Sequence, residues 1–464
     1  MAPRPGITLC VITKNEASNL PACLESVHGA VDAIVVVDTG SSDATVAIAQ
    51  AAGATVVYFP WIDDFAAARN AALPYVTTEF VLVLDADDRL AAGAAQALRA
   101  AVSDPGLDCG LLPQHDADHL DATPEQVLRV PATLVPRLLR KTADLAWRGR
   151  VHESIGEWIG VRRDRAAFID ARILHYGSVP LVRERLQKAE RNVRLLRLRV
   201  EEEPESATPR SLLGEELLNA GQVDEARIHF EAAWALLERA WEPPDGSPQR
   251  SFPPPIRALQ RYFGIKLDQD DFEGASEAVA KVIDWVGDDH PVVRFLRSRV
   301  EELAGDASDG DARREWLVRA VRGYRTCAQS HGLAYTEPVP PTVTGLAACI
   351  RLSVVLLKLN EPGHARAVAE GAIEQHGDHA DLRCVLAEAA LLQGAPARAL
   401  SVLGHDPGRT PVDIPDAWGL AAEAFTQIGD PTRASGAAHR AAEAESWREP
   451  HRLVRFLVIA EVLN

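Results

Sequence analysis

The chain has 464 residues, of which 47% are hydrophobic and 25% charged, and this composition excludes a wholly disordered, collagen-like or disulfide-scaffold protein. At about 150 residues per domain, the length predicts three domain equivalents, or two domains if one is a repeat array. The 49 basic and 66 acidic residues give a net charge of −17, so we expect neither nucleic acid nor an anionic membrane surface as a partner.

The six cysteines are isolated from one another and form no CxxC pair. This pattern favours buried thiols in a reducing compartment over disulfides or a zinc site. Residues 1–6 lack the basic and apolar parts of a signal peptide. The longest apolar runs, such as Phe80–Leu84, are far shorter than the ~18 residues that span a membrane. We therefore expect a cytoplasmic protein with no transmembrane segment.

The first hundred residues alternate between strand and helix signals. Short apolar runs predict strands, and apolar residues at helical spacing predict the helices between them. The predicted strands are Ile7–Thr13, Ala33–Val37, Thr55–Phe59, Phe80–Leu84 and Cys109–Leu112, and the predicted helices are Ala17–Val27, 42–52, 63–73 and Gly93–Val102. This alternation implies right-handed crossovers and a mainly parallel sheet, so we predict an α/β domain.

From about residue 181 the pattern is helical throughout. Leu181–Glu203 predicts one long helix. Farther along, Asn360, Gly394 and Gly429 recur at intervals of 34 and 35 residues, and each precedes an alanine by five residues. This period is the length of a tetratricopeptide repeat. We therefore predict an α/β domain at 1–180, a connecting helix at 181–204 and an all-α, tetratricopeptide-like domain at 205–464.

Polar segments follow four predicted strands, at the edge where open α/β sheets bind ligands. They are Thr13–Glu16, Asp38–Asp43, Trp61–Asn70 and Asp85–Asp88. A helix cap or a turn is the alternative to a ligand contact for Asp38. Asp85 and Asp87 are spaced so that they can share a hard divalent cation, which can in turn hold a diphosphate. The sequence has no GxGxxG or GxxxxGK[ST] motif, which argues against a dinucleotide fold or a P-loop.

Six motifs within residues 6 to about 240 resemble family 2 glycosyltransferases with the GT-A fold, and more narrowly a bacterial group that joins this domain to tetratricopeptide repeats. The motifs are Thr13-Lys14-Asn15-Glu16, Asp38-Thr39-Gly40-Ser41-Ser42-Asp43, Asp64-Phe65-Ala66-Ala67-Ala68-Arg69-Asn70, Leu84–Asp88, Arg148-Gly149-Arg150-Val151-His152-Glu153 and Leu174-His175-Tyr176-Gly177. The group resembles the glycocin-type peptide S-glycosyltransferases. Asp88 stands where many relatives have glutamate.

The resemblance implies an inverting transferase that uses a nucleotide-diphosphate sugar, a UDP-hexose for the family in general, and a divalent ion, Mg²⁺ or Mn²⁺. The residues that would bind the nucleotide sugar are Thr13, Asn15, Glu16, Asp38, Arg69, Asp85 and Ala86. Asp87 would ligate the metal, Asp85 would share it, and a late histidine, either His175 or His152, would complete the metal site.

Glu153 and its neighbour His152 are the predicted catalytic residues. Inverting transfer needs a base for the acceptor proton, and a glutamate can supply it. The alternative for Glu153 is a structural ion pair with Arg148 or Arg150. For Arg137, in the same basic stretch of the sequence, we predict a solvated face rather than a phosphate contact.

A repeat domain offers an extended binding surface, so we predict a peptide or protein acceptor. One alternative is a cell-envelope or natural-product acceptor, with repeats that form a homodimer. Another is a non-catalytic scaffold with a degenerate transferase domain. The intact set of Asp38, Asp85 and Asp87 argues against the scaffold.

Overall fold

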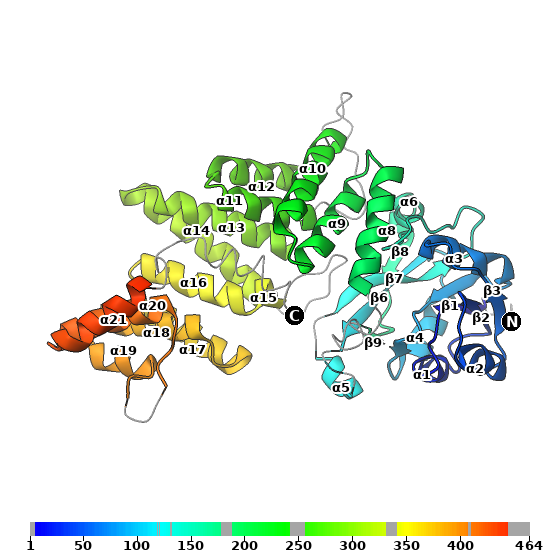
Figure 1. The fold of residues 1–464 in the computed structure, drawn as a ribbon, viewed down its shortest axis with the longest axis horizontal. Helices are drawn as coiled ribbons and strands as arrows, with labels where there is room; N and C mark the ends of the chain where they lie inside the picture. The colour runs from blue at the N-terminus through cyan, green and yellow to red at the C-terminus, as the bar shows by residue number, and fades with distance from the viewer. Residues whose placement is uncertain are drawn as a thin grey trace. The chain divides into compact units, whose positions relative to one another are not determined.

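The computed structural model describes residues 5–117, 119, 121–129, 132–177, 188–241, 256–330, 341–406 and 410–443. The chain packs into two compact units, one of residues 1–255 with 332–338 and the other of residues 256–331 with 339–464. The first contains a β-sheet and its helices, and the described part of the second is helical (Figure 1). The predicted domain boundaries at 180 and 204 fall inside the first unit and stay predictions.

A nine-stranded sheet lies at the centre of the first unit. Its strands are β1 (Ile7–Thr13), β2 (Ala33–Asp38), β3 (Thr55–Tyr58), β4 (Phe80–Val83), β5 (Asp88–Leu90), β6 (Cys109–Asp116), β7 (Thr133–Arg140), β8 (Ala166–Phe168) and β9 (Ile173–His175). They follow the order β3-β2-β1-β4-β7-β6-β9-β5, and β8 pairs with β6. Strands β1 to β4 are parallel, as predicted, whereas β7 runs antiparallel to both β4 and β6. The sheet is therefore mixed and parallel in its first half, which confirms the predicted fold class.

Helices cover both faces of this sheet. They are α1 (Leu20–Ser26), α2 (Thr45–Ala51), α3 (Phe65–Ala72), α4 (Ala94–Ala101), α5 (Pro124–Val127) and α6 (Gly156–Gly160). Leu20 of α1 and Leu98 of α4 pack on one face of the sheet. Ala72 of α3 and Trp158 of α6 belong to a second apolar cluster, on the other face. Burial on both faces explains why the strands read as continuous apolar runs.

After the sheet, the described part of the first unit contains the helices α8 (Lys188–Glu202), α9 (Ala207–Asn219) and α10 (Val223–Trp241). Helix α8 matches the described part of the helix predicted at 181–203, whose first residues lie outside the described ranges. Helices α9 and α10 pack together, and a Cβ at Gly214 would lie 2.7 Å from the Phe230 ring. This close approach requires a glycine at that position.

The second unit is built from helices that pack against their sequence neighbours. They are α11 (Ile256–Asp268), α12 (Phe272–Val286), α13 (Pro291–Asp306), α14 (Gly310–Gln329), α15 (Pro341–Thr344), α16 (Leu346–Lys358), α17 (Pro362–His376), α18 (Ala380–Leu392), α19 (Pro396–Val402), α20 (Pro415–Gln427) and α21 (Pro431–Glu443). The periodic residues Asn360, Gly394 and Gly429 follow α16, α18 and α20 with φ of 59°, 70° and 78°. The predicted period therefore marks the left-handed turn between the two helices of each pair.

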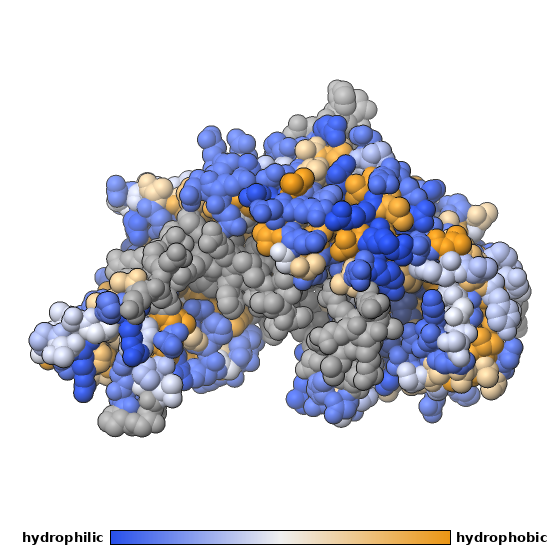
Figure 2. Space-filling model, in the orientation of Figure 1, coloured by the Kyte–Doolittle hydropathy of each residue, from blue (hydrophilic) through white to orange (hydrophobic). Residues whose placement is uncertain are grey.

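The face shown in Figure 2 is mainly hydrophilic, with hydrophobic residues scattered among polar ones. Within the described residues, no helix combines the length and the apolar character needed to cross a membrane.

Candidate active site

The loops after β1 and β2 meet at the carboxyl edge of the sheet. Thr13 and Asp38 are paired in the register of these two strands. The amide and hydroxyl of Thr39 both donate to the Thr13 carbonyl, at 2.9 and 3.0 Å. The Ser42 amide donates to Asn15 Oδ1 at 2.8 Å, and the Asn15 backbone has a φ of 58°. The two loops therefore form one hydrogen-bonded surface.

Asp38 and Glu16, which we predicted to bind the nucleotide sugar, form several hydrogen bonds on this surface. The Asp38 side chain is 4% exposed, and its carboxylate accepts from the amides of Gly40 and Ser41. These bonds form a turn, so Asp38 does not cap the next helix, α2. The Glu16 carboxylate accepts from Asn19 Nδ2 at 2.9 Å, and its amide donates to Thr45 Oγ1 at 2.8 Å.

Asp85 follows β4 and lies between two arginines. Arg69 Nη2 of α3 is 2.8 Å from its Oδ1, and Arg137 Nη2 of β7 is 3.1 Å from its Oδ2. Burial by itself would raise the pKa of Asp85, but the charges of Arg69 and Arg137 outweigh burial and hold that pKa well below its ordinary value. Asp85 is therefore an ionised carboxylate, and both of its oxygens already accept hydrogen bonds. Ala86, the next residue, is buried in the core.

Asp87, Asp88 and His175 form a group that can hold a metal ion. One ligand atom from each residue lies within 4.8 Å of the others. The antiparallel pairing of β5 with β9 sets Asp88 opposite His175, and the His175 Nδ1 atom is 2.8 Å from Asp88 Oδ1. Burial would lower the pKa of His175, but the hydrogen bond and charge of Asp88, with the charge of Asp87, raise it to about 9.

The group fits a hard divalent cation, because carboxylate oxygens are the ligands that such ions prefer and an imidazole adds a nitrogen ligand. It includes two of the three predicted metal ligands, Asp87 and His175. Asp88, which we did not predict as a ligand, is the third member, while the Asp85 carboxylate pairs with Arg69 and Arg137 and its predicted share in the metal stays a prediction. His152 is not part of the group.

Glu153 contacts the same arginine as Asp85. Arg69 Nε is 2.5 Å from Glu153 Oε1, and the Glu153 side chain is 12% exposed. The two partners that we considered for Glu153 pair elsewhere: Arg148 with Glu157 and Arg150 with Glu202. Arg69 therefore joins the predicted base to Asp85.

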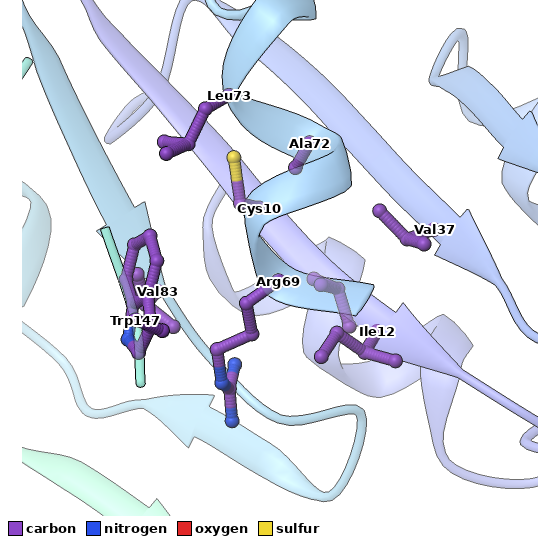
Figure 3. Close-up of a pocket in the computed structure, with 9 residues that line it drawn as sticks. Cys10, Ile12, Val37, Arg69, Ala72, Leu73, Val83 and Trp147 are labelled. Atoms are coloured by element: carbon purple, nitrogen blue, oxygen red, sulfur yellow. The ribbon is translucent and has the colours of Figure 1, made fainter. Parts of the chain in front are cut away.

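A small pocket lies beside Arg69, between α3 and the sheet. Its lining residues are Cys10, Val11, Ile12, Val37, Arg69, Ala72, Leu73, Val83 and Trp147. In Figure 3 the Arg69 side chain leaves α3 with Ile12 and Trp147 on either side of it in the view. Burial raises the pKa of the Cys10 thiol to about 12, so this sulfur stays protonated and is not a nucleophile. Arg69 is one of the residues that line this pocket, and its guanidinium pairs with Asp85 and Glu153.

Sequence reasoning missed Arg137, Asp88 and Gly177. Arg137 is not on a solvated face: its side chain is 14% exposed and pairs with Asp85 and Asp88. The strand-like sequence around Arg137 could have revealed an inward side chain. Gly177 lies against the candidate metal group, since a Cβ there would overlap the Asp87 carboxylate. Its position two residues after His175, in the same motif, could have indicated that Gly177 lies near the metal group.

Residues 8–167 match the model of the family described as glycosyl transferase family 2, and residues 348–424 match that of a tetratricopeptide repeat. The first unit therefore contains a family 2 glycosyltransferase domain. Asp38, Asp85, Asp87 and Asp88 lie within the residues that match the transferase family, and His175 follows them in sequence. The repeat match confirms a tetratricopeptide region in the C-terminal part of the chain, at residues 348–424.

Two curated relatives each align with about half of this chain. A TPR repeat-containing protein of Synechococcus elongatus is 34% identical over 230 residues, or 48% of this chain and 54% of the relative. The prophage-derived glycosyltransferase SunS of Bacillus subtilis is 26% identical over 220 residues, or 46% of this chain and 49% of SunS. The alignments thus span about half the length of these relatives. Among solved structures, S. aureus TarS is similar with a TM-score of 0.33 and 16% identity, over 70% of this chain and 55% of TarS.

Proposed function

We propose that this protein is an inverting, metal-dependent glycosyltransferase that transfers a hexose from a UDP-hexose to a peptide or protein acceptor. The observation that carries the proposal is one continuous edge of the glycosyltransferase domain, which bears Asp38, the arginine-bound Asp85 and the Asp87–Asp88–His175 group. An edge of this kind suits a ligand that has a base, a ribose and a diphosphate. The resemblance of the sequence motifs to the glycocin-type peptide S-glycosyltransferases supports the peptide acceptor.

In the proposed complex, the donor lies along this edge. Asp38 and the loop from Thr13 to Glu16, including Asn15, bind the base and the ribose. Asp85, which its arginines keep ionised, accepts hydrogen bonds from donor hydroxyls. Arg69 faces the diphosphate. A Mg²⁺ or Mn²⁺ ion held by Asp87, Asp88 and His175 would neutralise charge on the leaving diphosphate.

Glu153 is the proposed base. The nucleophilic atom of the acceptor attacks the anomeric carbon from the face opposite the nucleotide, and its proton passes to the Glu153 carboxylate. The bond between the sugar and the phosphate breaks, and its electron pair leaves with the nucleoside diphosphate. Arg69 orients the Glu153 carboxylate through its Nε atom.

Donor turnover tests the transferase chemistry. Purified full-length protein is incubated with UDP-glucose, UDP-N-acetylglucosamine and GDP-mannose, with Mn²⁺, with Mg²⁺ or with EDTA. We expect one donor to be consumed only with metal, and Asp87→Asn to lose this turnover while the exposed Asp170→Asn control keeps it. Failure to consume any sugar nucleotide would favour the scaffold alternative.

Peptide arrays and light scattering test the acceptor. Transfer to a peptide, with inversion at the anomeric carbon detected by NMR, supports the proposal. A dimeric full-length protein that glycosylates only envelope or natural-product acceptors would support the alternative use of the repeats.

A further inference from the structure

Helix α8 follows the glycosyltransferase domain in sequence and contacts the two segments that carry Arg69 and Glu153. One is the start of α3. Both terminal nitrogens of Arg194 pair with the Asp63 carboxylate, at 2.7 and 2.8 Å. The guanidinium of Arg191 lies 5.0 Å from the centre of the Phe65 ring. Helix α8 therefore contacts α3 one to two turns before Arg69.

The other segment is residues 148–154, which carries Glu153. Arg199 of α8 is 5% exposed, and its Nη1 atom donates to the carbonyls of Val151 and His152, at 2.9 and 3.1 Å. Its Nε atom donates to Glu203 at 2.7 Å. A buried guanidinium with these bonds fixes the backbone immediately before Glu153.

The backbone at residues 149–152 has an uncommon conformation that leaves room for the Arg199 side chain. Gly149 has a φ of 95°, and a Cβ at this position would overlap the Arg199 guanidinium. His152 has a φ of 50°, which is uncommon for a residue with a side chain. The His152 Nε2 atom lies 3.6 Å from Glu216 Oε1 of α9, so the His152 ring also faces a helix that follows the sheet in sequence. Arg199 and Glu216, which stabilise this unusual backbone, both lie beyond residues 8–167, the part of the chain that matches the transferase family.

The two segments are also bonded to each other. The Phe65 amide donates to the Arg150 carbonyl at 2.8 Å. The Asn70 side chain bonds both the amide and the carbonyl of Trp147, at 2.8 and 2.9 Å. Together with the pair of Arg69 and Glu153, these bonds make a rigid connection from α8 to the proposed base.

We propose that Arg199 is a positioning residue for Glu153, and that α8 and α9 are part of the catalytic unit rather than a connector to the repeats. The proposal rests on the assignment of Glu153 as the base. Loss of Arg199 frees the backbone of residues 151–152, so Glu153 no longer faces Arg69 in one geometry. The donor surface formed by the loops after β1 and β2 has no part in this connection.

The test compares Arg199→Met with Arg197→Met in the full-length protein. Arg197 lies on the same helix, is half exposed and pairs with Glu225 of α10, so it controls for loss of an α8 arginine. Amide hydrogen exchange should become faster in residues 148–154 of Arg199→Met and stay unchanged in β1 and β4. Its kcat should fall about a hundredfold, as for a misplaced catalytic group. The donor KM should stay within about twofold, since Asp38 and the loops after β1 and β2 keep their contacts. Arg197→Met should match the wild type in both measurements.

Arg199→Lys keeps the charge but lacks the fork of donors, and it should show the same changes at smaller size. It decides the outcome if Arg199→Met does not fold. Wild-type exchange in residues 148–154 of the variant would overturn positioning by α8. Faster exchange with wild-type kcat would overturn the link to Glu153. If the wild type itself turns over no donor, the proposed function fails, whereas the exchange measurement still tests whether Arg199 orders the segment.

Discussion

Each unit of the molecule contains a carboxylate between arginines, and the two differ in their access to solvent. Asp85 pairs with Arg69 and Arg137 at the edge of the sheet, and its side chain is 35% exposed. Glu302 of α13 pairs with Arg299 and Arg351, and its side chain is fully buried. The local charges are alike, but a ligand can reach only one of the carboxylates.

The partners of the Glu302 carboxylate all come from the second unit. Glu302 accepts from Arg351 of α16, from Lys358 Nζ at 2.7 Å and from the Tyr324 hydroxyl of α14 at 3.0 Å. Burial would raise the pKa of Glu302, but the charges of Arg351 and Arg299 outweigh it and hold that pKa well below its ordinary value. Charge clustering alone therefore does not mark a functional site, and an accessible edge is also needed.

The largest expected effect is on stability, from Glu302→Gln. This variant leaves Arg299 and Arg351 buried without their counter-charge, which should destabilise the second unit by about 3–5 kcal/mol. Denaturant unfolding, followed by hydrogen exchange in α13 and α16, measures the change. Glu370→Gln is the matched control, because Glu370 is half exposed and its pairs with Arg366 and Arg398 lie at the surface. Equal stability of the two variants would mean that the buried network is not needed for the fold.

In contrast to Glu302→Gln, Asp85→Asn should lower activity strongly and stability little. The two arginines keep other partners, Glu153 for Arg69 and Asp88 for Arg137, and the site is open to water. We therefore expect little change in Tm. We expect kcat/KM for the donor to fall about a hundredfold, the size typical of a lost polar contact in an active site. Calorimetry and steady-state kinetics on the same preparation measure both. A large loss of Tm with normal kcat/KM would make Asp85 a structural residue like Glu302.

Gly177→Ala tests how closely the candidate metal group is packed. Besides Asp87, the new Cβ would lie 2.8 Å from the His175 ring, so two of the three ligands would have to move. Mn²⁺ affinity, followed by electron paramagnetic resonance, should fall about tenfold. Gly160→Ala is the control, because a Cβ at Gly160 would have no atom within 4 Å. Unchanged Mn²⁺ affinity in Gly177→Ala would mean that the metal does not bind at this group.

The first half of the site could be predicted from sequence because its residues directly follow recognisable strands. Thr13, Asp38 and Asp85 each follow a buried apolar run, and neighbouring parallel strands bring such residues to one edge. The repeat period was equally readable, since each turn requires a residue that tolerates positive φ.

The other half depends on pairing between distant segments. His175 reaches Asp88 through two strands of three residues each, which are too short to show a periodic pattern. Arg137 reaches Asp85 across an antiparallel strand that we did not predict. Arg199 reaches the backbone before Glu153 from a helix nearly fifty positions away. Single-sequence patterns report local structure, so they did not show that Arg137 and Arg199 reach these segments from elsewhere in the chain.

A further expected effect is a pH dependence of stability that arises in the second unit. His290 caps α13, where its Nδ1 atom accepts from the Val292 amide, and burial lowers its pKa from 6.5 to about 4. Unfolded His290 therefore binds a proton between about pH 6.5 and 4 that the folded form excludes. Its contribution to stability is fully present above pH 6.5 and is lost as the pH falls toward 4. His290→Asn keeps a side chain suited to capping the helix but does not titrate. The difference in Tm between wild type and this variant should shift in favour of the variant from pH 7 to pH 4.5, as measured by calorimetry. A difference that stays constant over this range would mean that folded His290 accepts the proton as readily as the unfolded chain.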